Sequence, residues 1–418
     1  MPVQLSRRDF VMVAGVGLLA PAAWAQRSSD LRLLAFVSSW TQGPFGIGGG
    51  GGLQVFAVDG ADGAMTLLSH TGPELDNMNA GSLCLAPDGR HLYATNEVKN
   101  LGGEPGAGGG VLSFAIDPRS GTLQHVGTQP SMGVNPAYIT IDATGSIVAA
   151  ANHGDYEPVV TVVERDGRPQ IEKVFDDGTA ALFPVRADST LAPSSDVAVL
   201  PWARGIDPVS QRSPHAHSIN FDPSNRMAIV CDKGADRVFA FRLDLAAGRL
   251  VDGRAFSAEA GIAPRHSAFH PREPYVFVIN ERQSSLSSYR FDAATAELEL
   301  IQTAATVPDG FSERNAPADV HVHPNGRFVY GSNRGHDSIA VFAVDEGTGG
   351  LTRRAIVPTG GASPRGFNLD PSGRFLFAAN QNSNTIVTFA VDPDDGSLTP
   401  TGARADCLKP VCVKLAVI

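Results

Sequence analysis

The sequence predicts an all-β fold, a seven-bladed β-propeller whose ring is closed by the C-terminal strand. Three observations support this prediction. A unit of about 50 residues recurs along the chain, the two chain ends hold complementary parts of one further unit, and the composition suits short strands. The 418 residues include 45 glycines and 29 prolines and only 18% are charged, as expected for many strands joined by turns.

The repeated unit begins with an apolar strand, continues through Asp-Pro-x-Gly-Arg or a related turn, and ends with a second apolar strand and Asn or Asp. Its clearest copy is PRGFNLDPSGRFLFAANQ at 364–381. A second phrase follows each copy, with an alternating strand, a turn containing Asp and Gly, and another strand, as in IVTFAVDPDDGSLT. Each unit therefore holds four short strands, the number found in a propeller blade.

Six copies of the first phrase are complete, and each ends at one of these residues: Asn96, Asn152, Asp232, Asn280, Asn333 and Asn380. The last four markers are 48, 53 and 47 residues apart. The first two are 56 residues apart because a glycine-rich loop at 102–110 lies between them. The 80 residues from the second marker to the third predict an insertion at about 176–213.

The seventh unit is split between the two ends of the chain. Residues 31–40 resemble the second strand of a unit that has no first strand, and residues 409–418 resemble a first strand with nothing after it. Joining them completes a seventh blade and leaves no open sheet edge. We therefore expect residues 26–418 to form a single propeller domain.

Residues 1–25 are expected to be a twin-arginine signal peptide. Paired arginines at 7–8 precede an apolar run at 11–23, and Ala23-Trp24-Ala25 is a small-x-small cleavage site. A membrane anchor is the alternative, but the run is too short to span a bilayer comfortably. We expect export by the twin-arginine machinery, cleavage after Ala25, and a periplasmic protein with no stable membrane association after cleavage.

The net charge of −10 and the pI of about 5.5 argue against a nucleic acid or an anionic membrane surface as a partner. The four cysteines are too few for a disulfide framework, and there is no CxxC motif. The sequence leaves open whether Cys407 and Cys412 form a disulfide.

The candidate site follows from the topology of a blade. The first strand starts, and the second strand ends, on the same face of the disc, whereas the Asp-Pro-x-Gly-Arg turns lie on the opposite face and are structural. The positions after the first-strand proline are Ala137, His215, Arg265, Ala318, Arg365 and Val411. Those after the second-strand Asn or Asp are Glu97, His153, Lys233, Glu281, Arg334 and Gln381. A polar rim around a water-filled channel is the alternative, but this density of charges favours a binding or catalytic site.

The mature sequence resembles the bacterial lactonase family, which includes a propeller-type 6-phosphogluconolactonase and carboxymuconate-lactonizing enzymes. Four stretches carry the resemblance: RSPHAHSINFDP, GIAPRHSAFHP followed by VINE, VHPNGRFVYGSNRGHDSIAVF and SPRGFNLDPSGRFLFAANQ. It implies catalytic roles for these residues: His217 (or His215), Arg265, Glu281 and Arg334. Asn225 stands where the family turn has glycine, on the face away from the site. We expect these further rim residues to bind substrate: His215, Arg365, Lys233 and His153.

Two histidines at i and i+2 on one strand, His215 and His217, also raise the possibility of a metal site. A metal needs further ligands, and no Asp or Glu cluster accompanies this pair or the similar His321 and His323. We expect no metal and no cofactor. His321 and His323 are expected to pack between blades, and His217 to act in acid–base chemistry or to orient the substrate.

The leading hypothesis is an exported, 6-phosphogluconolactonase-like hydrolase that opens a sugar lactone. Glu281 or His217 would activate water, and Arg265 and Arg334 would stabilise the oxyanion or bind a substrate carboxylate or phosphate. Export argues against a phosphorylated sugar as the substrate. A cycloisomerase acting on a muconate-type diacid at the same site and a non-catalytic binding propeller are the alternatives.

Overall fold

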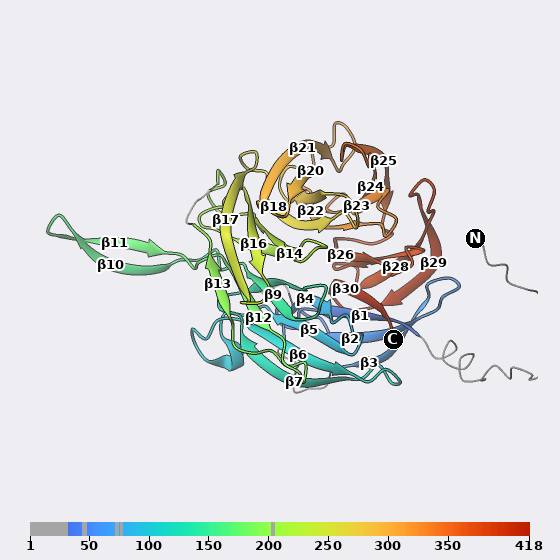
Figure 1. The fold of residues 1–418 in the computed structure, drawn as a ribbon, viewed down its shortest axis with the longest axis horizontal. Coiled ribbons are helices and arrows are strands. Elements are labelled where there is room, and N and C mark those ends of the chain that lie inside the picture. The colour runs from blue at the N-terminus through green and yellow to red at the C-terminus, as the bar shows by residue number, and fades with distance from the viewer. Residues whose placement is uncertain (1–31, 44–47, 72–74, 76–77, 202–204) are drawn as a thin grey trace, which may run out of the picture. The chain divides into compact units, whose positions relative to one another are not determined.

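Seven four-stranded antiparallel sheets form a ring of blades (Figure 1). The computed structural model describes residues 32–43, 48–71, 75, 78–201 and 205–418, so the predicted signal peptide lies outside the described residues. The seven-bladed propeller predicted from the repeat is confirmed. Within the described part of the chain, no helix is long and apolar enough to cross a membrane.

Blades 2 and 4–7 each use four consecutive strands, named from the channel outward. Blade 2 consists of β4 (Ala80–Leu85), β5 (His91–Asn96), β6 (Gly110–Ile116) and β7 (Leu123–Pro130). Blade 4 consists of β14 (Ala216–Phe221), β15 (Met227–Asp232), β16 (Arg237–Asp244) and β17 (Arg249–Ser257). Blade 5 consists of β18 (Pro264–Phe269), β19 (Tyr275–Asn280), β20 (Ser285–Asp292) and β21 (Glu297–Ala305). Blade 6 consists of β22 (Ala316–Val322), β23 (Phe328–Arg334), β24 (Ser338–Val344) and β25 (Leu351–Pro358). Blade 7 consists of β26 (Pro364–Leu369), β27 (Phe375–Asn380), β28 (Thr385–Val391) and β29 (Leu398–Asp406).

Blade 1 joins the two ends of the chain, as the split repeat predicts. Its strands are β30 (Pro410–Val417), β1 (Leu33–Ser39), β2 (Leu53–Val58) and β3 (Met65–His70). The C-terminal β30 is the innermost strand, pairs with β1, and contacts the inner strands of both neighbouring blades. The ring therefore has no open inner edge.

Apolar side chains fill the space between each pair of neighbouring blades. Leu34, Phe36 and Phe114 are buried together between blades 1 and 2, and equivalent clusters lie at the other six junctions. On the far face, Asp222 Oδ1 accepts hydrogen bonds from the backbone N–H groups of Arg226 and Met227 at 2.8 and 2.6 Å. Asn225 takes the glycine position there with φ of 56°, a conformation that asparagine tolerates.

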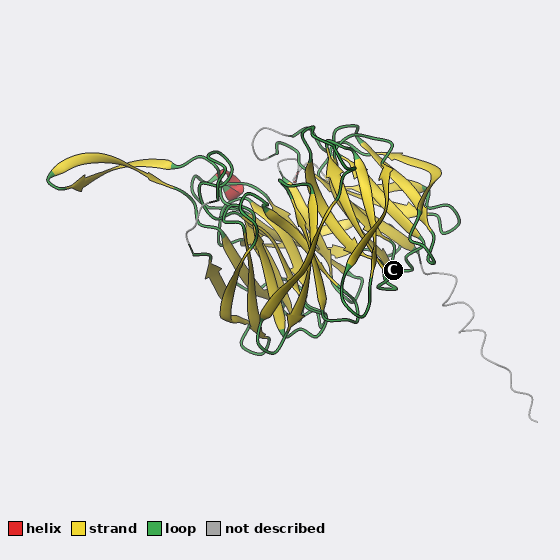
Figure 2. Cartoon of the chain, turned by 90° about the horizontal axis from the view of Figure 1, so that it is seen from above, coloured by secondary structure: helices red, strands yellow, loops and turns green. Residues whose placement is uncertain are grey.

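The structure places the additional segment of blade 3 earlier than the predicted insertion at 176–213. Strands β12 (Thr179–Pro184) and β13 (Asp196–Val199) lie inside that range and complete the blade begun by β8 (Pro136–Ile141) and β9 (Ile147–Asn152). The extra element is a hairpin of β10 (Val159–Arg165) and β11 (Arg168–Val174), which extends away from the ring (Figures 1 and 2). Positive φ angles of 54° at Asp166 and 70° at Gly167 fit a two-residue type I′ turn. In sequence, two strands joined by an Asp-Gly turn resemble the two outer strands of a blade. The prediction therefore assigned this hairpin to blade 3 and the true outer strands to the insertion.

Candidate active site

A β-bulge in the inner strand aims one side chain of each blade into the channel. In blade 5, Pro264 pairs with Asn280 and His266 pairs with Ile279, so Arg265 between them has no residue opposite. The same register shift occurs at the start of the other inner strands. Bulges reorient side chains in this way. The bulged residues that line the channel include Ala137, His217, Arg265, Arg365 and Val411.

This register corrects the predicted alignment of His215 with Arg265. Ala216 pairs with Asp232 as Pro264 pairs with Asn280, so His217 is the equivalent of Arg265. The prediction counted from the proline of each inner strand. In blade 5 that proline, Pro264, is itself the paired residue, but in blade 4 Pro214 lies two residues before the paired residue, Ala216. His217 therefore lines the channel, whereas His215 precedes β14.

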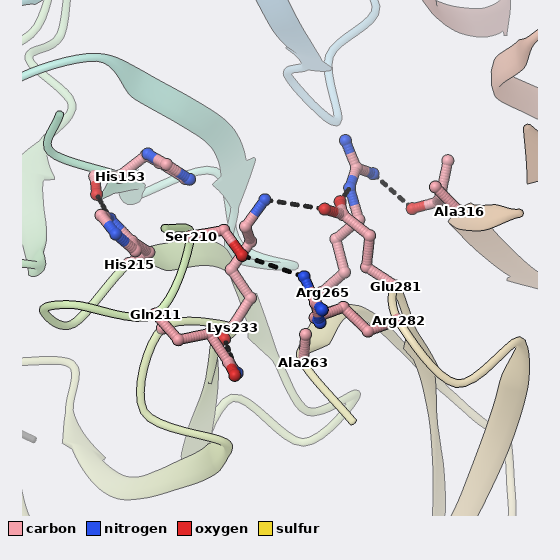
Figure 3. Close-up of polar contacts among 12 residues, drawn as sticks. His153, Ser210, Gln211, His215, Lys233, Ala263, Arg265, Glu281, Arg282 and Ala316 are labelled. Atoms are coloured by element: carbon pink, nitrogen blue, oxygen red, sulfur yellow. Dashed lines mark hydrogen bonds and ion pairs between the residues drawn. The ribbon is translucent and has the colours of Figure 1, made fainter. Parts of the chain in front are cut away.

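Three cations surround the carboxylate of Glu281, which follows β19 (Figure 3). Its Oε1 atom accepts a hydrogen bond from Lys233 Nζ at 2.8 Å. Its Oε2 atom accepts from Arg265 Nε at 2.9 Å and from Arg334 Nη2 at 3.0 Å. The ring thus brings together four predicted site residues from three blades.

Electrostatics fix the charge states in this cluster. Burial would raise the pKa of Glu281, but Lys233, Arg334 and Arg265 hold that pKa well below its usual range. Burial together with the charge of Arg334 lowers the pKa of Arg265 to about 10, so it is still a cation at neutral pH. Glu281 is consequently a permanent anion that positions cations, and its low pKa makes it a weak base.

His153 and His215 form a stacked pair beside Lys233 (Figure 3). Their ring centroids are 4.5 Å apart with 18° between the planes, and His215 Nδ1 donates to the His153 carbonyl at 2.8 Å. Tyr156 Oη lies 3.2 Å from His153 Nε2. Burial lowers the pKa of His215 to about 4 and that of His153 well below its usual range, so both rings are neutral at pH 7.

A second polar group, centred on Glu97, lies in blades 1, 2 and 7. Trp40 Nε1 donates to Glu97 Oε2 at 2.9 Å, and the Arg365 guanidinium lies 4.2 Å from the centre of the Trp40 ring. A Cβ atom at Gly81 would come within 2.2 Å of Glu97 Oε2, so only glycine leaves room for this carboxylate. Burial raises the pKa of Glu97 to about 7, partly offset by Arg365 and by Trp40.

Deeper in the channel, Asp319 holds two histidines. His266 Nδ1 donates to Asp319 Oδ1 at 2.9 Å and His321 Nε2 to Asp319 Oδ2 at 3.2 Å. Arg265 in turn contacts His266 Nε2 at 3.1 Å, so this chain orients the arginine. His323 donates to the Gly373 carbonyl of the next blade at 3.0 Å, in agreement with the predicted inter-blade packing. Among the described residues, no group of three or more His, Cys, Asp or Glu side chains is arranged to hold a metal ion.

Several buried polar atoms on the rim have no hydrogen-bond partner in the part of the chain that the structure describes. They include His215 Nε2, His217 Nδ1 and Gln381 Nε2. Buried polar groups are normally satisfied, so these atoms are places where a polar ligand or ordered water would bind.

A hollow of about 400 Å³ opens on the same face and is lined by Glu97, Asn79, Asn100 and Asp155, among others. Its volume suits a small ligand. A larger hollow, of about 690 Å³, lies between blades 6 and 7 on the opposite face. That larger hollow is lined by strand residues of blades 6 and 7 and by turn residues such as Asp345 and Asp394, away from the cationic rim, so we place the candidate site at the rim.

Sequence reasoning missed three contributors to the site: Trp40, His266 and Asp319. Trp40 ends the apolar stretch 31–40, and His266 follows Arg265 directly, so both lay within motifs already quoted. Their roles depend on contacts between different blades, which no local pattern encodes.

The closed seven-bladed ring, with charged side chains and unpartnered buried polar atoms among the described residues at its channel mouth, defines a β-propeller with a polar candidate site. The chain matches the family model "Lactonase, 7-bladed beta-propeller" over residues 35–415, and it belongs to this family. The resemblance inferred from the motifs is therefore confirmed.

Relatives and solved structures agree with this assignment. The chain is 32% identical to a 6-phosphogluconolactonase of Bacillus subtilis (strain 168), over 62% of this chain and 67% of the relative. It is also 32% identical to a 6-phosphogluconolactonase of Formosa agariphila, over 76% of this chain and 82% of the relative. The Pseudomonas aeruginosa periplasmic gluconolactonase has a similar structure, with a TM-score of 0.76, 29% identity, and coverage of 93% of this chain and 99% of that one.

Proposed function

We propose that this protein is a lactonase that hydrolyses a sugar lactone at the channel mouth. The observation that carries the proposal is the group of three cations on Glu281 beside Arg365, in a chain that belongs to the lactonase propeller family. The names of the B. subtilis and F. agariphila relatives support the same reaction.

Lactone hydrolysis requires a stabilised oxyanion, an activated water and a proton for the departing alkoxide. Arg334 Nη1 and the whole Arg365 guanidinium make no hydrogen bond to any described residue. These N–H groups are suited to bind the oxyanion and a substrate carboxylate or phosphate. Glu281 keeps Lys233, Arg265 and Arg334 in position for this task.

For proton transfer, Glu97 is better suited than Glu281. It borders the hollow, its Oε1 atom has no hydrogen-bond partner among the described residues, and its pKa of about 7 lets it both accept and release a proton at neutral pH. The predicted catalytic residue His217 is neutral, because burial and the charge of Arg265 hold its pKa well below the usual range. We propose that Glu97 transfers the proton and that His217 orients the water or the lactone.

We also propose export by the twin-arginine machinery, cleavage after Ala25, and action in the periplasm on an unphosphorylated sugar lactone. The paired arginines at 7–8 and the apolar run at 11–23 support export. The similar P. aeruginosa structure is described as a periplasmic gluconolactonase, which supports both the compartment and the substrate class.

The decisive experiment measures proton release at constant pH by the mature chain, residues 26–418. The panel contains glucono-δ-lactone, its 6-phosphate and several γ-lactones, each corrected for spontaneous hydrolysis. We expect saturable release that Arg265→Ala lowers at least 100-fold, because the variant removes one of the cations that share the Glu281 carboxylate with Arg334. Arg404→Ala, at an exposed position on β29, is the control. Absence of release with every lactone would contradict the proposal, and conversion of a muconate-type diacid would instead indicate a cycloisomerase.

Arg365→Ala should change binding more than chemistry. Burial and repulsion from Arg265 and Arg334 lower the pKa of Arg365, and the guanidinium has no ion-pair partner among the described residues. Its loss should therefore leave the melting temperature unchanged or slightly higher. We expect KM for an anionic lactone to rise about 10-fold, the value of one charge-assisted contact, with a smaller rise for neutral glucono-δ-lactone. Steady-state kinetics on both substrates test this; equal changes for the two would show that Arg365 does not contact the substrate anion.

A further inference from the structure

Two buried side chains that line the hollow of about 400 Å³ each carry an acceptor oxygen with no hydrogen-bond partner among the described residues. They are Asn135 and Glu97, which are 3% and 4% exposed. Asn135 Nδ2 donates to the Gly154 carbonyl at 3.1 Å, which leaves Oδ1 free. Trp40 Nε1 donates to Glu97 Oε2 at 2.9 Å, which leaves Oε1 free. Because buried acceptors require a donor, this hollow is suited to a ligand that carries hydroxyl groups.

The charges of the same hollow disfavour a phosphate group. Lys99 is the one cation among the described residues that line it, and it forms an ion pair with the buried carboxylate of Asp155. The backbone holds this carboxylate in place: the Glu157 N–H donates to Asp155 Oδ1 at 3.1 Å, and the Asp155 N–H donates to Asp176 Oδ2 at 3.1 Å. A phosphate inside the hollow would meet the carboxyl groups of Glu97 and Asp155, and the cation that could bind it is already neutralised.

The chemistry of a lactone determines which part of the substrate enters this hollow. In the proposed reaction Glu97 transfers a proton, and the departing ring oxygen is the atom that must receive one. In a six-carbon δ-lactone this oxygen is bonded to C5, the carbon that also carries the C6 substituent. A substrate whose ring oxygen contacts Glu97 therefore places C6 beside the hollow that Glu97 lines. The group on C6 is a hydroxymethyl group in a free sugar lactone and a phosphate ester in its 6-phosphate.

We propose, on the basis of the lactonase activity proposed above, that Asn135 and Asp155 determine the specificity of this site for a lactone with a free 6-hydroxyl group. Asn135 Oδ1 accepts a hydrogen bond from that hydroxyl group. Asp155 acts through Lys99, because the ion pair prevents the ammonium group from binding a 6-phosphate. The hollow thus distinguishes an unphosphorylated lactone from its phosphate ester, whereas the cationic rim attracts both.

The preference for glucono-δ-lactone over its 6-phosphate, measured as the ratio of the two kcat/KM values, tests the role of Asp155. The wild type should prefer the free lactone by about 10-fold or more. Asp155→Asn keeps the shape of the side chain but releases the charge of Lys99, so this ratio should fall by about 10-fold, the value of one charge-assisted contact. The double variant Asp155→Asn/Lys99→Met should show no gain with the 6-phosphate. Asp188→Asn, an exposed position between β12 and β13 of the same blade, is the matched control.

Asn135→Gly tests the contact with the hydroxyl group. Glycine readily adopts the φ of 51° that Asn135 has, so the backbone is retained while Oδ1 is lost. KM for glucono-δ-lactone should rise about fivefold, the value of one hydrogen bond. KM for δ-valerolactone, which has no hydroxyl group, should not change. An equal rise for the two lactones would show that Asn135 only supports the loop, and would overturn its assignment to substrate recognition.

Calorimetric binding of gluconate and 6-phosphogluconate separates this inference from the proposed function, because binding requires no turnover. The wild type should bind gluconate about 10-fold more tightly than 6-phosphogluconate, and Asp155→Asn should lose this preference. The same binding pattern in a chain that hydrolyses no lactone would support the hollow as a selective site and contradict the lactonase activity. Lactone turnover in which Asp155→Asn leaves both preferences unchanged would overturn the inference alone, as would a wild type that prefers the phosphorylated ligands.

Discussion

Replacing Glu281 by glutamine is expected to lower lactone turnover by about a thousandfold, the largest effect that we predict. The substitution removes the one anion held by Lys233, Arg265 and Arg334 at 2.8–3.0 Å. Without it the three cations repel each other and leave their positions. Because buried cations then lack compensation, the free energy of unfolding should also fall by roughly 3 kcal/mol.

Proton-release kinetics and thermal unfolding measured on the same preparation check both parts of this expectation. Glu299→Gln, an exposed position on β21 of the same blade, is the control for the loss of a negative charge. Wild-type turnover in Glu281→Gln would show that the cation cluster is structural. If Glu281→Gln loses turnover but keeps the wild-type free energy of unfolding, the cations separate without destabilising the fold and the cluster acts only in catalysis.

Replacing Glu97 by glutamine should remove the ionisation near pH 7 from the activity profile. In the wild type, kcat should rise as pH increases through about 7, where Glu97 loses its proton and becomes a base. The variant should be about 100-fold less active and lack this rise. Glu104→Gln, an exposed position in the loop after β5, is the control. An unchanged pH profile would show that Glu97 does not transfer the proton and that His217 or water alone does so.

The same variant should change how stability depends on pH. The pKa of Glu97 is about 7 in the fold against an ordinary 4.5, so the folded state holds the proton more tightly than the unfolded state does. This contribution is fully present below about pH 4.5 and is lost as pH rises through about 7. Glu97→Gln does not lose this contribution. The free energy of unfolding of the variant minus that of the wild type should therefore increase by up to about 3 kcal/mol between low pH and pH values above 7. Urea unfolding at several pH values measures the difference.

The sequence was sufficient for the fold because each blade repeats the same turn and the same terminal Asn or Asp. The same frame correctly placed four residues at one rim. Lys233, Glu281 and Arg334 each directly follow a marker, and Arg265 follows Pro264, which pairs with the marker Asn280. It misplaced His215 because Pro214 lies outside the strand register. It also could not reveal that Trp40 of blade 1 binds Glu97 of blade 2, because propensities and turn signals say nothing about neighbours in another blade.

The shared first blade has a consequence for biosynthesis. β30 follows all the other described strands in the chain and pairs with β1, which precedes them, so the ring stays open until β30 has been synthesised. A product truncated before β30 would therefore expose the inner edge of β1.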